Sequence, residues 1–280
     1  MSGRSNVLIN GVETDLVSSA DRGLQFGDGL FETIAIEDGL VEYWPEHIQR
    51  LQHGASVLGI ECPDEQVWRE DIRKCLDGRP GSWVIKIMLT RGFSERGYTV
   101  PPGLKPNRIL KLSAAPDWPA RNSTDGILAR RCQQRLSSNA TLAGIKHLNR
   151  LDNVLARREL RSHQYEGIVY DQAGQPVEGT MSNLFCVTEG VLRTPEITEC
   201  GIDGVIRQRI IAGDHGVTCR IGLNETMLDD ADEIFFCNSL IGIWPVRRLD
   251  DRDLQPGLVT RRMMTWLTED REANRLDVEN

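Results

Sequence analysis

The sequence predicts an α+β fold, and two features of its pattern support this. Short apolar segments are joined by tight turns such as Asn10-Gly11 and Asp38-Gly39, which are typical of β-hairpins. Segments with helical spacing, such as residues 45–58, lie between these strands without a regular strand-helix-strand alternation. This mixture favours antiparallel sheets with added helices over a regular α/β arrangement.

The predicted elements of the first part of the chain are short strands and two helices. The glycine-rich stretch 23–29 precedes a strand at 30–34, so we expect no helix dipole there that could bind phosphate. Pro45 suits the first turn of a helix, and Gly59 suits its end. The further predictions are a helix at 64–76, a strand at 83–90, a polar loop to Pro101 and a strand at 110–114.

Residues 115–123 contain two prolines among small polar residues and are the best candidate for a linker. We therefore expect an N-terminal domain at 1–114 and a larger domain at 124–280. In the second domain we predict strands at 126–131, 167–171, 176–187, 191–194 and 233–238, and helices at 148–163, from Gly204, and after Pro256-Gly257.

The composition is that of an ordinary globular protein with a small-molecule partner. The chain has 280 residues, of which 40% are hydrophobic and 26% charged, and its formal net charge is −8. These values exclude collagen-like, low-complexity and largely disordered chains. A dense Lys/Arg stripe is missing, as is a run of about 18 apolar residues, so we expect neither nucleic-acid binding nor a membrane span.

The seven cysteines are widely spread and contain no Cys-x-x-Cys pair. This spacing favours reduced thiols over a disulfide framework or a thiolate zinc site. The five histidines have no metal-ligand spacing either. We therefore expect a cytoplasmic protein without a bound metal.

Lysine is scarce, because only five of the 33 basic residues are lysines. Lys146 follows the small apolar run 143–145 and precedes a predicted helix, where an amine can be partly desolvated and its pKa lowered. A deprotonated lysine can form a Schiff base with a carbonyl, which arginine cannot do. The alternative is a surface lysine at a helix entrance. Lys86 and Lys111 lie in predicted strands and could be residues within a β-sheet or at its edge.

Four other segments could bind parts of a cofactor, and each also has a plain structural interpretation. Glu178, on a short apolar strand, could hold a protonated pyridine nitrogen or could be an exposed strand end. Arg50, in the first long helix, could bind a phosphate or face solvent. The helix start at Gly204 and the turn at Asn238-Ser239 offer further N–H and hydroxyl donors.

Taken in chain order, these segments resemble the fold-type IV pyridoxal-phosphate enzymes, a family of aminotransferases and lyases. The resemblance covers nearly the whole chain and lies in Asp21–Thr33, His47–Leu51, Ile145–Ala156, Glu178-Gly179 with Ser182–Phe185, Gly201–Arg207 and Cys237–Leu240. It implies a small α/β N-terminal domain and a larger domain with a barrel-like sheet. It also implies that pyridoxal 5′-phosphate is linked to Lys146, the expected catalytic residue, and bound by Arg50, Glu178, Val205, Ile206, Asn238 and Ser239.

Within this family, residues 146–156 are most similar to the aminodeoxychorismate lyases. Phe31 stands where D-amino-acid transaminases carry a tyrosine, and Tyr98 where they carry a histidine. The resemblance implies conversion of 4-amino-4-deoxychorismate to 4-aminobenzoate and pyruvate in folate biosynthesis. It implies Phe31, Arg96 and Tyr98 as substrate contacts, and a homodimer. A branched-chain or D-amino-acid aminotransferase is the alternative function. A non-enzymatic binding module on the same scaffold is a third hypothesis.

Overall fold

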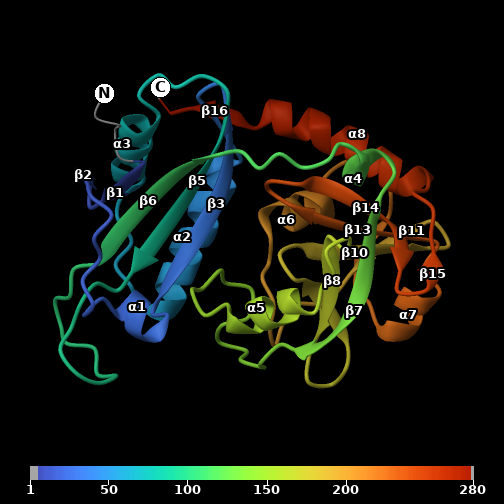
Figure 1. Cartoon of the computed structure of the whole chain (residues 1–280), viewed down its shortest axis with the longest axis horizontal. Helices are drawn as coiled ribbons and strands as arrows, with labels where there is room; N and C mark the ends of the chain where they lie inside the picture. The colour runs from blue at the N-terminus through green and yellow to red at the C-terminus, as the bar shows by residue number, and fades with distance from the viewer. Residues whose placement is uncertain (1–5, 279–280) are drawn as a thin grey trace. The chain divides into compact units, whose positions relative to one another are not determined.

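The computed structural model describes residues 6–278, which separate into two compact units (Figure 1). Unit 1 contains the chain up to Pro116, the short segment Ile145–Asn149 and the C-terminal segment from Asn274. Unit 2 contains Asp117–Gly144 and Arg150–Ala273. The segment that carries Lys146 thus packs with unit 1. The domain boundaries expected from the sequence stay a prediction.

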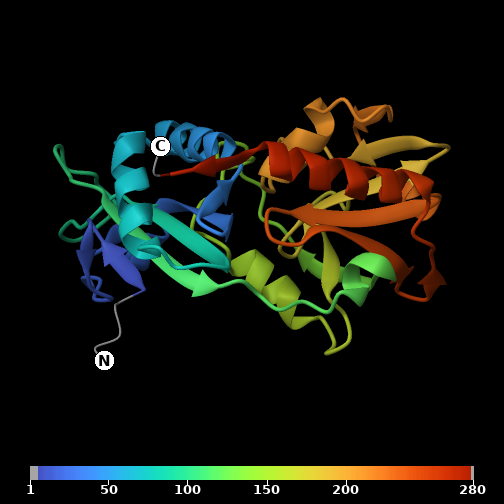
Figure 2. The ribbon, with the colours of Figure 1, turned by 90° about the horizontal axis from the view of Figure 1, so that it is seen from above.

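Unit 1 is built on a seven-stranded sheet with the order β16-β4-β3-β5-β6-β1-β2, in which neighbouring strands are antiparallel. Helix α2 packs on β3, and α3 packs on β1 and β6 (Figure 2). The strands are β1 (Val7–Ile9), β2 (Val12–Glu13), β3 (Gly29–Glu37), β4 (Leu40–Glu42), β5 (Ser82–Thr90), β6 (Asn107–Ala114) and β16 (Arg275–Asp277). The helices are α1 (Arg22–Phe26), α2 (Trp44–Leu58) and α3 (Glu65–Leu76).

The residues of β3 alternate between two faces of this sheet, as the period of a strand requires. Leu30, Ile34 and Ile36 are buried and face the same side as Glu32, whose carboxylate contacts α2. The intervening residues, beginning with Phe31, are less buried and point to the opposite face. One strand therefore supplies both the support of α2 and one wall of the candidate site.

Helix α1 was not expected, because the glycine-rich stretch suggested only a loop before a strand. The side chain of Asp21 accepts a hydrogen bond from the N–H of Leu24 and caps the start of this helix. Gly27 ends it in the left-handed region at φ 67°. Both cap residues are visible in the sequence, but the helix between them is only five residues long.

Unit 2 contains a closed six-stranded barrel, in which the strands pair in the ring β7-β8-β9-β10-β13-β14 and back to β7. This confirms the barrel-like sheet. The ring strands are β7 (Ile127–Arg135), β8 (Glu166–Tyr170), β9 (Pro176–Gly179), β10 (Asn183–Thr188), β13 (Glu233–Asn238) and β14 (Gly242–Leu249). Strands β11 (Val191–Thr194) and β12 (Cys219–Ile221) extend the sheet beyond β10, and β15 (Arg252–Asp253) pairs with β14.

Five helices accompany this barrel in the described part of the chain. Helices α6 and α8 both contact β13 (Figure 1). The helices are α4 (Arg121–Thr124), α5 (Leu151–Arg158), α6 (Val205–Ala212), α7 (Glu225–Asp229) and α8 (Leu258–Ala273). Among residues 6–278, the structure contains no helix with the length and hydropathy needed to cross a bilayer.

Two sequence predictions in this region were wrong in their extent. The helix predicted at 148–163 is only α5, because the preceding segment pairs with β3: Phe31 N–H donates to the carbonyl of Lys146, and Leu148 N–H donates to that of Gly29. The strand predicted at 176–187 is divided into β9 and β10 by a turn at residues 180–182. The late start of α5 therefore arises from long-range hydrogen bonds to β3.

Candidate cofactor and substrate site

The structure brings Lys146 and Phe31 together on one face of the sheet of unit 1. The Lys146 Nζ lies 4.4 Å from the centre of the Phe31 ring, and the Lys86 Nζ lies 4.9 Å from it. Lys86 is opposite Thr33 in the β3–β5 register and therefore shares the face of Phe31. Burial lowers the pKa of Lys86, and the nearby charge of Lys111 lowers it further. Two amines thus meet at one aromatic ring.

Arg50 of helix α2 is buried and is held by Glu32 of β3. The Arg50 Nε donates to Glu32 Oε1 at 2.9 Å, and the Nη2 donates to Oε2 at 2.5 Å. The Nδ1 of His47, also buried, lies 2.6 Å from the same Oε2. The guanidinium plane is therefore fixed by a pair of parallel hydrogen bonds.

The charges in this cluster follow from burial and from the arginine. Burial alone would raise the pKa of Glu32, but the charge of Arg50 and the hydrogen bond from His47 lower it to about 2. The pKa of His47 is lowered, chiefly by burial, so the imidazole is neutral near pH 7. Sequence reasoning missed Glu32, although a charged residue at an apolar position of an alternating strand was a usable signal.

Glu178 lies in unit 2, on the strand that closes the barrel, where it pairs with Asn183. It is only 3% exposed. Its Oε1 accepts a hydrogen bond from the Asn153 side-chain amide at 3.2 Å, and its Oε2 accepts one from the Ile202 N–H at 2.8 Å. The alternative of an exposed strand end is wrong. The contact from Asn153 was not predicted.

Val205 and Ile206 are buried and begin helix α6, as predicted. The Asn183 amide donates to the carbonyl of Ile202 and fixes the turn before this helix. At Gly204 a Cβ would lie 2.0 Å from Asn183 Oδ1, so only glycine fits there without a shift. The first N–H groups of such a helix are suited to an anion such as a phosphate.

The turn at Asn238-Ser239 is also rigid. Asn238 Oδ1 accepts hydrogen bonds from the N–H groups of Leu240 and Ile241, and its Nδ2 donates to the carbonyl of Met181. The carbonyl of Ser239 accepts a hydrogen bond from an arginine of α8 at 2.7 Å. These contacts hold the backbone of the turn in place.

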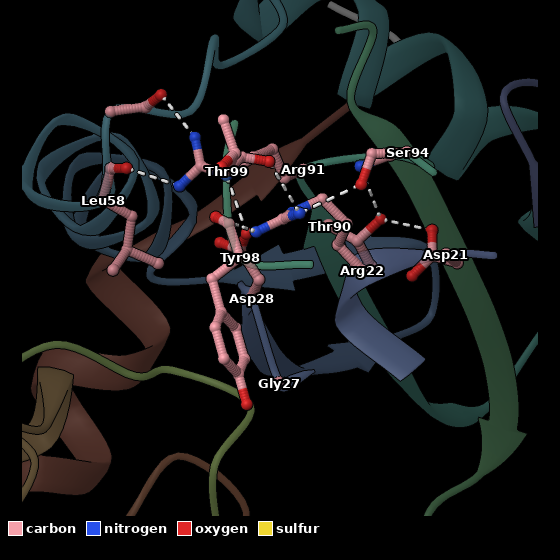
Figure 3. A network of polar contacts seen from close by, with 12 residues as sticks. Asp21, Arg22, Gly27, Asp28, Leu58, Thr90, Arg91, Ser94, Tyr98 and Thr99 are labelled. Carbon is pink, nitrogen blue, oxygen red and sulfur yellow. Dashed lines mark hydrogen bonds and ion pairs between the residues drawn. The ribbon is translucent and has the colours of Figure 1, made fainter. Parts of the chain in front are cut away.

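The loop that carries Arg96 and Tyr98 is tied to unit 1 through its backbone (Figure 3). The guanidinium of Arg22 donates to the hydroxyl of Ser94 and to the carbonyls of Gly97, Tyr98 and Thr99. In Figure 3 the Tyr98 ring points away from this polar network, and the side chain is 83% exposed. Arg96 is exposed as well. The single chain therefore fixes the loop but leaves both predicted substrate contacts in solvent.

Asp28 anchors the base of this loop. Its Oδ2 accepts hydrogen bonds from Arg22 Nε at 2.9 Å and from Arg91 Nε at 2.7 Å. Burial would raise the pKa of Asp28, but the two guanidinium groups lower it. Arg91 also donates to the carbonyls of Leu58 and Gly59 at the end of α2. The loop is thus joined to a long helix through charge-assisted hydrogen bonds.

Each unit by itself contains groups that match parts of pyridoxal phosphate. Unit 1 supplies an amine at Lys146 and a buried guanidinium at Arg50. Unit 2 supplies a buried carboxylate at Glu178 and a helix N-terminus at Val205-Ile206. An aldehyde, a phosphate and a ring nitrogen each have a chemically matched residue among these.

Comparison with known proteins gives the same family. Residues 29–249 match the family model described as amino-transferase class IV. The crystal structure of 4-amino-4-deoxychorismate lyase from Pseudomonas aeruginosa is 38% identical, covers 97% of this chain and 99% of its own, and has a TM-score of 0.89.

Two curated relatives carry different names. Aminodeoxychorismate lyase from Vibrio harveyi is 32% identical over 270 residues, which are 91% of this chain and 97% of the relative. A putative branched-chain-amino-acid aminotransferase from Methanocaldococcus jannaschii is 32% identical over 257 residues, 88% of each chain. The resemblance seen in the sequence is therefore confirmed, and the chain belongs to the class IV aminotransferase family, whose members depend on pyridoxal phosphate.

Proposed function

We propose that this protein is a pyridoxal-phosphate-dependent lyase that converts 4-amino-4-deoxychorismate to 4-aminobenzoate and pyruvate, a step of folate biosynthesis. The observation that carries the proposal is the similarity to the Pseudomonas aeruginosa lyase over 97% of the chain, with Lys146 on the Phe31 face of the sheet. Phe31 has no hydroxyl with which to bind a substrate carboxylate in the manner of a tyrosine, and this disfavours D-amino-acid transamination.

Each proposed residue has a distinct task. When bound, pyridoxal phosphate supplies an aldehyde that condenses with amines and a ring that accepts an electron pair. Arg50 and the N–H groups at Val205-Ile206 bind the phosphate, and the turn at Asn238-Ser239 adds donors. Glu178 keeps the ring nitrogen protonated.

With the cofactor bound, Lys146 would hold its aldehyde until a substrate amine takes that place, and the freed Lys146 amine would then remove the proton from the amine-bearing carbon of the substrate. The carbon–oxygen bond to the neighbouring enolpyruvyl group breaks, and a proton from Lys146 completes pyruvate. Aromatisation of the remaining ring makes the step downhill. The atoms of the substrate are all found in the two products, so no second keto substrate is needed.

The substrate carries two carboxylates, and the amine, guanidinium and hydroxyl groups of unit 1 suit them. Lys86 lies on the same face as Lys146, and Arg96 and Tyr98 lie on the anchored loop. We assign Phe31 to the wall against which the substrate ring packs.

An aminotransferase of the same family is the second candidate, favoured by the similarity to the Methanocaldococcus jannaschii protein. Purified protein loaded with pyridoxal phosphate should release fluorescent 4-aminobenzoate from aminodeoxychorismate without a keto acid. A protein that forms no 4-aminobenzoate, and instead passes amino groups from an amino acid to 2-oxoglutarate, would overturn the lyase assignment.

Lys146→Ala should lose covalent labelling by borohydride and lower turnover by about a thousandfold or more, because the amine acts as both acid and base. Peptide mapping after reduction checks the label at residue 146. Lys105→Ala, which changes an exposed lysine, is the matched control and should keep both properties. A Lys146→Ala protein that is still labelled and active contradicts the proposal.

The proposal also includes a cytoplasmic homodimer. The seven cysteines are all free in the structure, which is typical of proteins from a reducing compartment. The exposed apolar side chains around α1, such as Leu24 and Phe93, support the dimer.

A further inference from the structure

The Glu178 carboxylate is held from two sides. Asn153 Nδ2 donates to its Oε1 at 3.2 Å, and the backbone N–H of Ile202 donates to its Oε2 at 2.8 Å. The side chain is only 3% exposed, so the carboxylate receives its hydrogen bonds from these protein donors instead of from water. A carboxylate that receives one donor on each oxygen has a fixed plane and direction.

Asn153 is itself fixed by its neighbours. Its Nδ2 also donates to the carbonyl of Thr180 at 3.3 Å, in the turn between β9 and β10. Its Oδ1 accepts a hydrogen bond from Arg150 Nη1 at 3.4 Å. The amide therefore joins Arg150 to Glu178, and exchange of its oxygen and nitrogen would break all three contacts.

Arg150 brings a positive charge to this chain of contacts. Burial lowers the pKa of its guanidinium, and the charges of Glu178 and Asp152 oppose this. Arg150 directly precedes α5 but gives that helix no side-chain cap. Its guanidinium instead donates to Asn153, whose amide donates to the buried carboxylate. An opposite charge offsets part of the cost of keeping a carboxylate ionised away from water.

We infer that Arg150 and Asn153 are positioning residues for Glu178: Asn153 orients the carboxylate and Arg150 fixes the Asn153 amide, so that the carboxylate recognises the protonated ring nitrogen of the cofactor. The inference rests on the proposed use of pyridoxal phosphate. It assigns to α5 a role in selecting the ring nitrogen, in addition to its packing against β7 and β8.

The test measures cofactor affinity and does not require turnover. Full-length apoprotein is titrated with pyridoxal phosphate and, separately, with its 1-deaza analogue, in which carbon replaces the ring nitrogen. The change in the ratio of the two dissociation constants between wild type and a variant reports the ring-nitrogen contact. Wild-type protein should prefer pyridoxal phosphate by about tenfold or more, as expected for a hydrogen bond to a charged group.

Asn153→Leu should reduce this preference to about twofold or less, and Arg150→Met should lower it as well, whereas Arg150→Lys should retain most of it. Glu178→Gln should abolish the preference, and adding Asn153→Leu to Glu178→Gln should change the ratio no further, because the two residues act through one contact. Asn153→Ala serves if the leucine variant does not fold.

Two changes in the same unit are matched controls. Asn122→Leu removes another buried asparagine amide, and Arg158→Met removes an exposed arginine of α5. Both should keep the wild-type ratio. The inference would be overturned if Asn153→Leu and Asn153→Ala kept the wild-type preference for pyridoxal phosphate while Glu178→Gln lost it. The proposed function would still stand in that case. Wild-type protein that binds neither compound would overturn the proposed function itself.

Discussion

At the scale of single residues, the candidate site is supported by charged groups that the sequence alone left unexplained. Glu32 holds Arg50 through two hydrogen bonds and lies beside the neutral His47. A guanidinium buried without a counter-ion would be strongly disfavoured. Glu32 thus fixes, inside the unit, the guanidinium of Arg50, which we propose to bind the cofactor phosphate.

This arrangement predicts a pH-dependent contribution to stability. The pKa of Glu32 is about 2 in the folded chain and 4.5 ordinarily, so its ionised form stabilises the fold. That contribution is complete above about pH 4.5 and is lost as the pH falls toward 2. Glu32→Gln should lower the free energy of unfolding by on the order of 3 kcal/mol at pH 7. The difference in the free energy of unfolding between wild type and Glu32→Gln should narrow below pH 4.5.

Denaturant unfolding of both proteins across pH 2.5–7 measures this gap. Glu13→Gln, at an exposed position of the same sheet, should show no comparable loss. A gap that stays constant through the acidic range would mean that the Glu32 charge does not stabilise the fold.

At the scale of elements, the turn between β9 and β10 depends on one buried carboxylate. Glu166 is fully buried; its Oε1 accepts hydrogen bonds from the N–H and the hydroxyl of Thr180, and its Oε2 from the hydroxyl of Ser182 and the N–H of Met181. These contacts form the turn that divides the strand predicted at 176–187. The same turn follows Gly179, the last residue of β9, and so sets the end of the strand that carries Glu178.

Glu166→Gln should destabilise the protein by about 3 kcal/mol, because the new amide donors face hydroxyl and N–H donors. Thermal unfolding measured by circular dichroism checks this. Glu269→Gln, at an exposed site of α8, should change stability by less than about 0.5 kcal/mol. Equal melting temperatures for the wild type and Glu166→Gln would show that the carboxylate does not hold the turn.

At the scale of the whole molecule, unit 1 exposes apolar side chains on adjoining segments. Leu24 of α1 is 67% exposed and Phe93 is 59% exposed, and Tyr98 lies 5.2 Å from Phe26, measured between ring centres. Exposed apolar side chains gathered on adjoining segments are suited to a protein interface, and we propose that a second copy of this chain binds there. The patch contains the loop of Arg96 and Tyr98, so a second copy bound there would remove the proposed substrate contacts from bulk solvent.

Leu24→Glu should therefore shift the protein from dimer toward monomer, because a charge would be buried in the interface. Analytical ultracentrifugation at micromolar concentration measures the change. Leu258→Glu, which changes an exposed leucine of unit 2, should leave the dimer intact. A wild-type protein that sediments as a monomer would contradict the proposed assembly.

The sequence by itself determined the α+β class, the helices near 45–58 and 64–76, and the residues whose chemistry suits pyridoxal phosphate. These features depend on local periodicity, on cap residues and on side-chain chemistry, all of which are readable along the chain. Each of these residues alone was weak evidence for a cofactor site. The family resemblance, which comparison confirmed, combined them into one prediction.

Only the tertiary structure decided which distant residues meet. It paired β16 with β4 across more than two hundred residues, placed the Lys146 segment beside β3, and supplied Glu32 to Arg50 and Asn153 to Glu178. Hydrogen bonds of this kind depend on how elements pack, and neither propensity nor spacing encodes the partner. The sequence determined which chemical groups this protein has, and long-range packing decided how each is held.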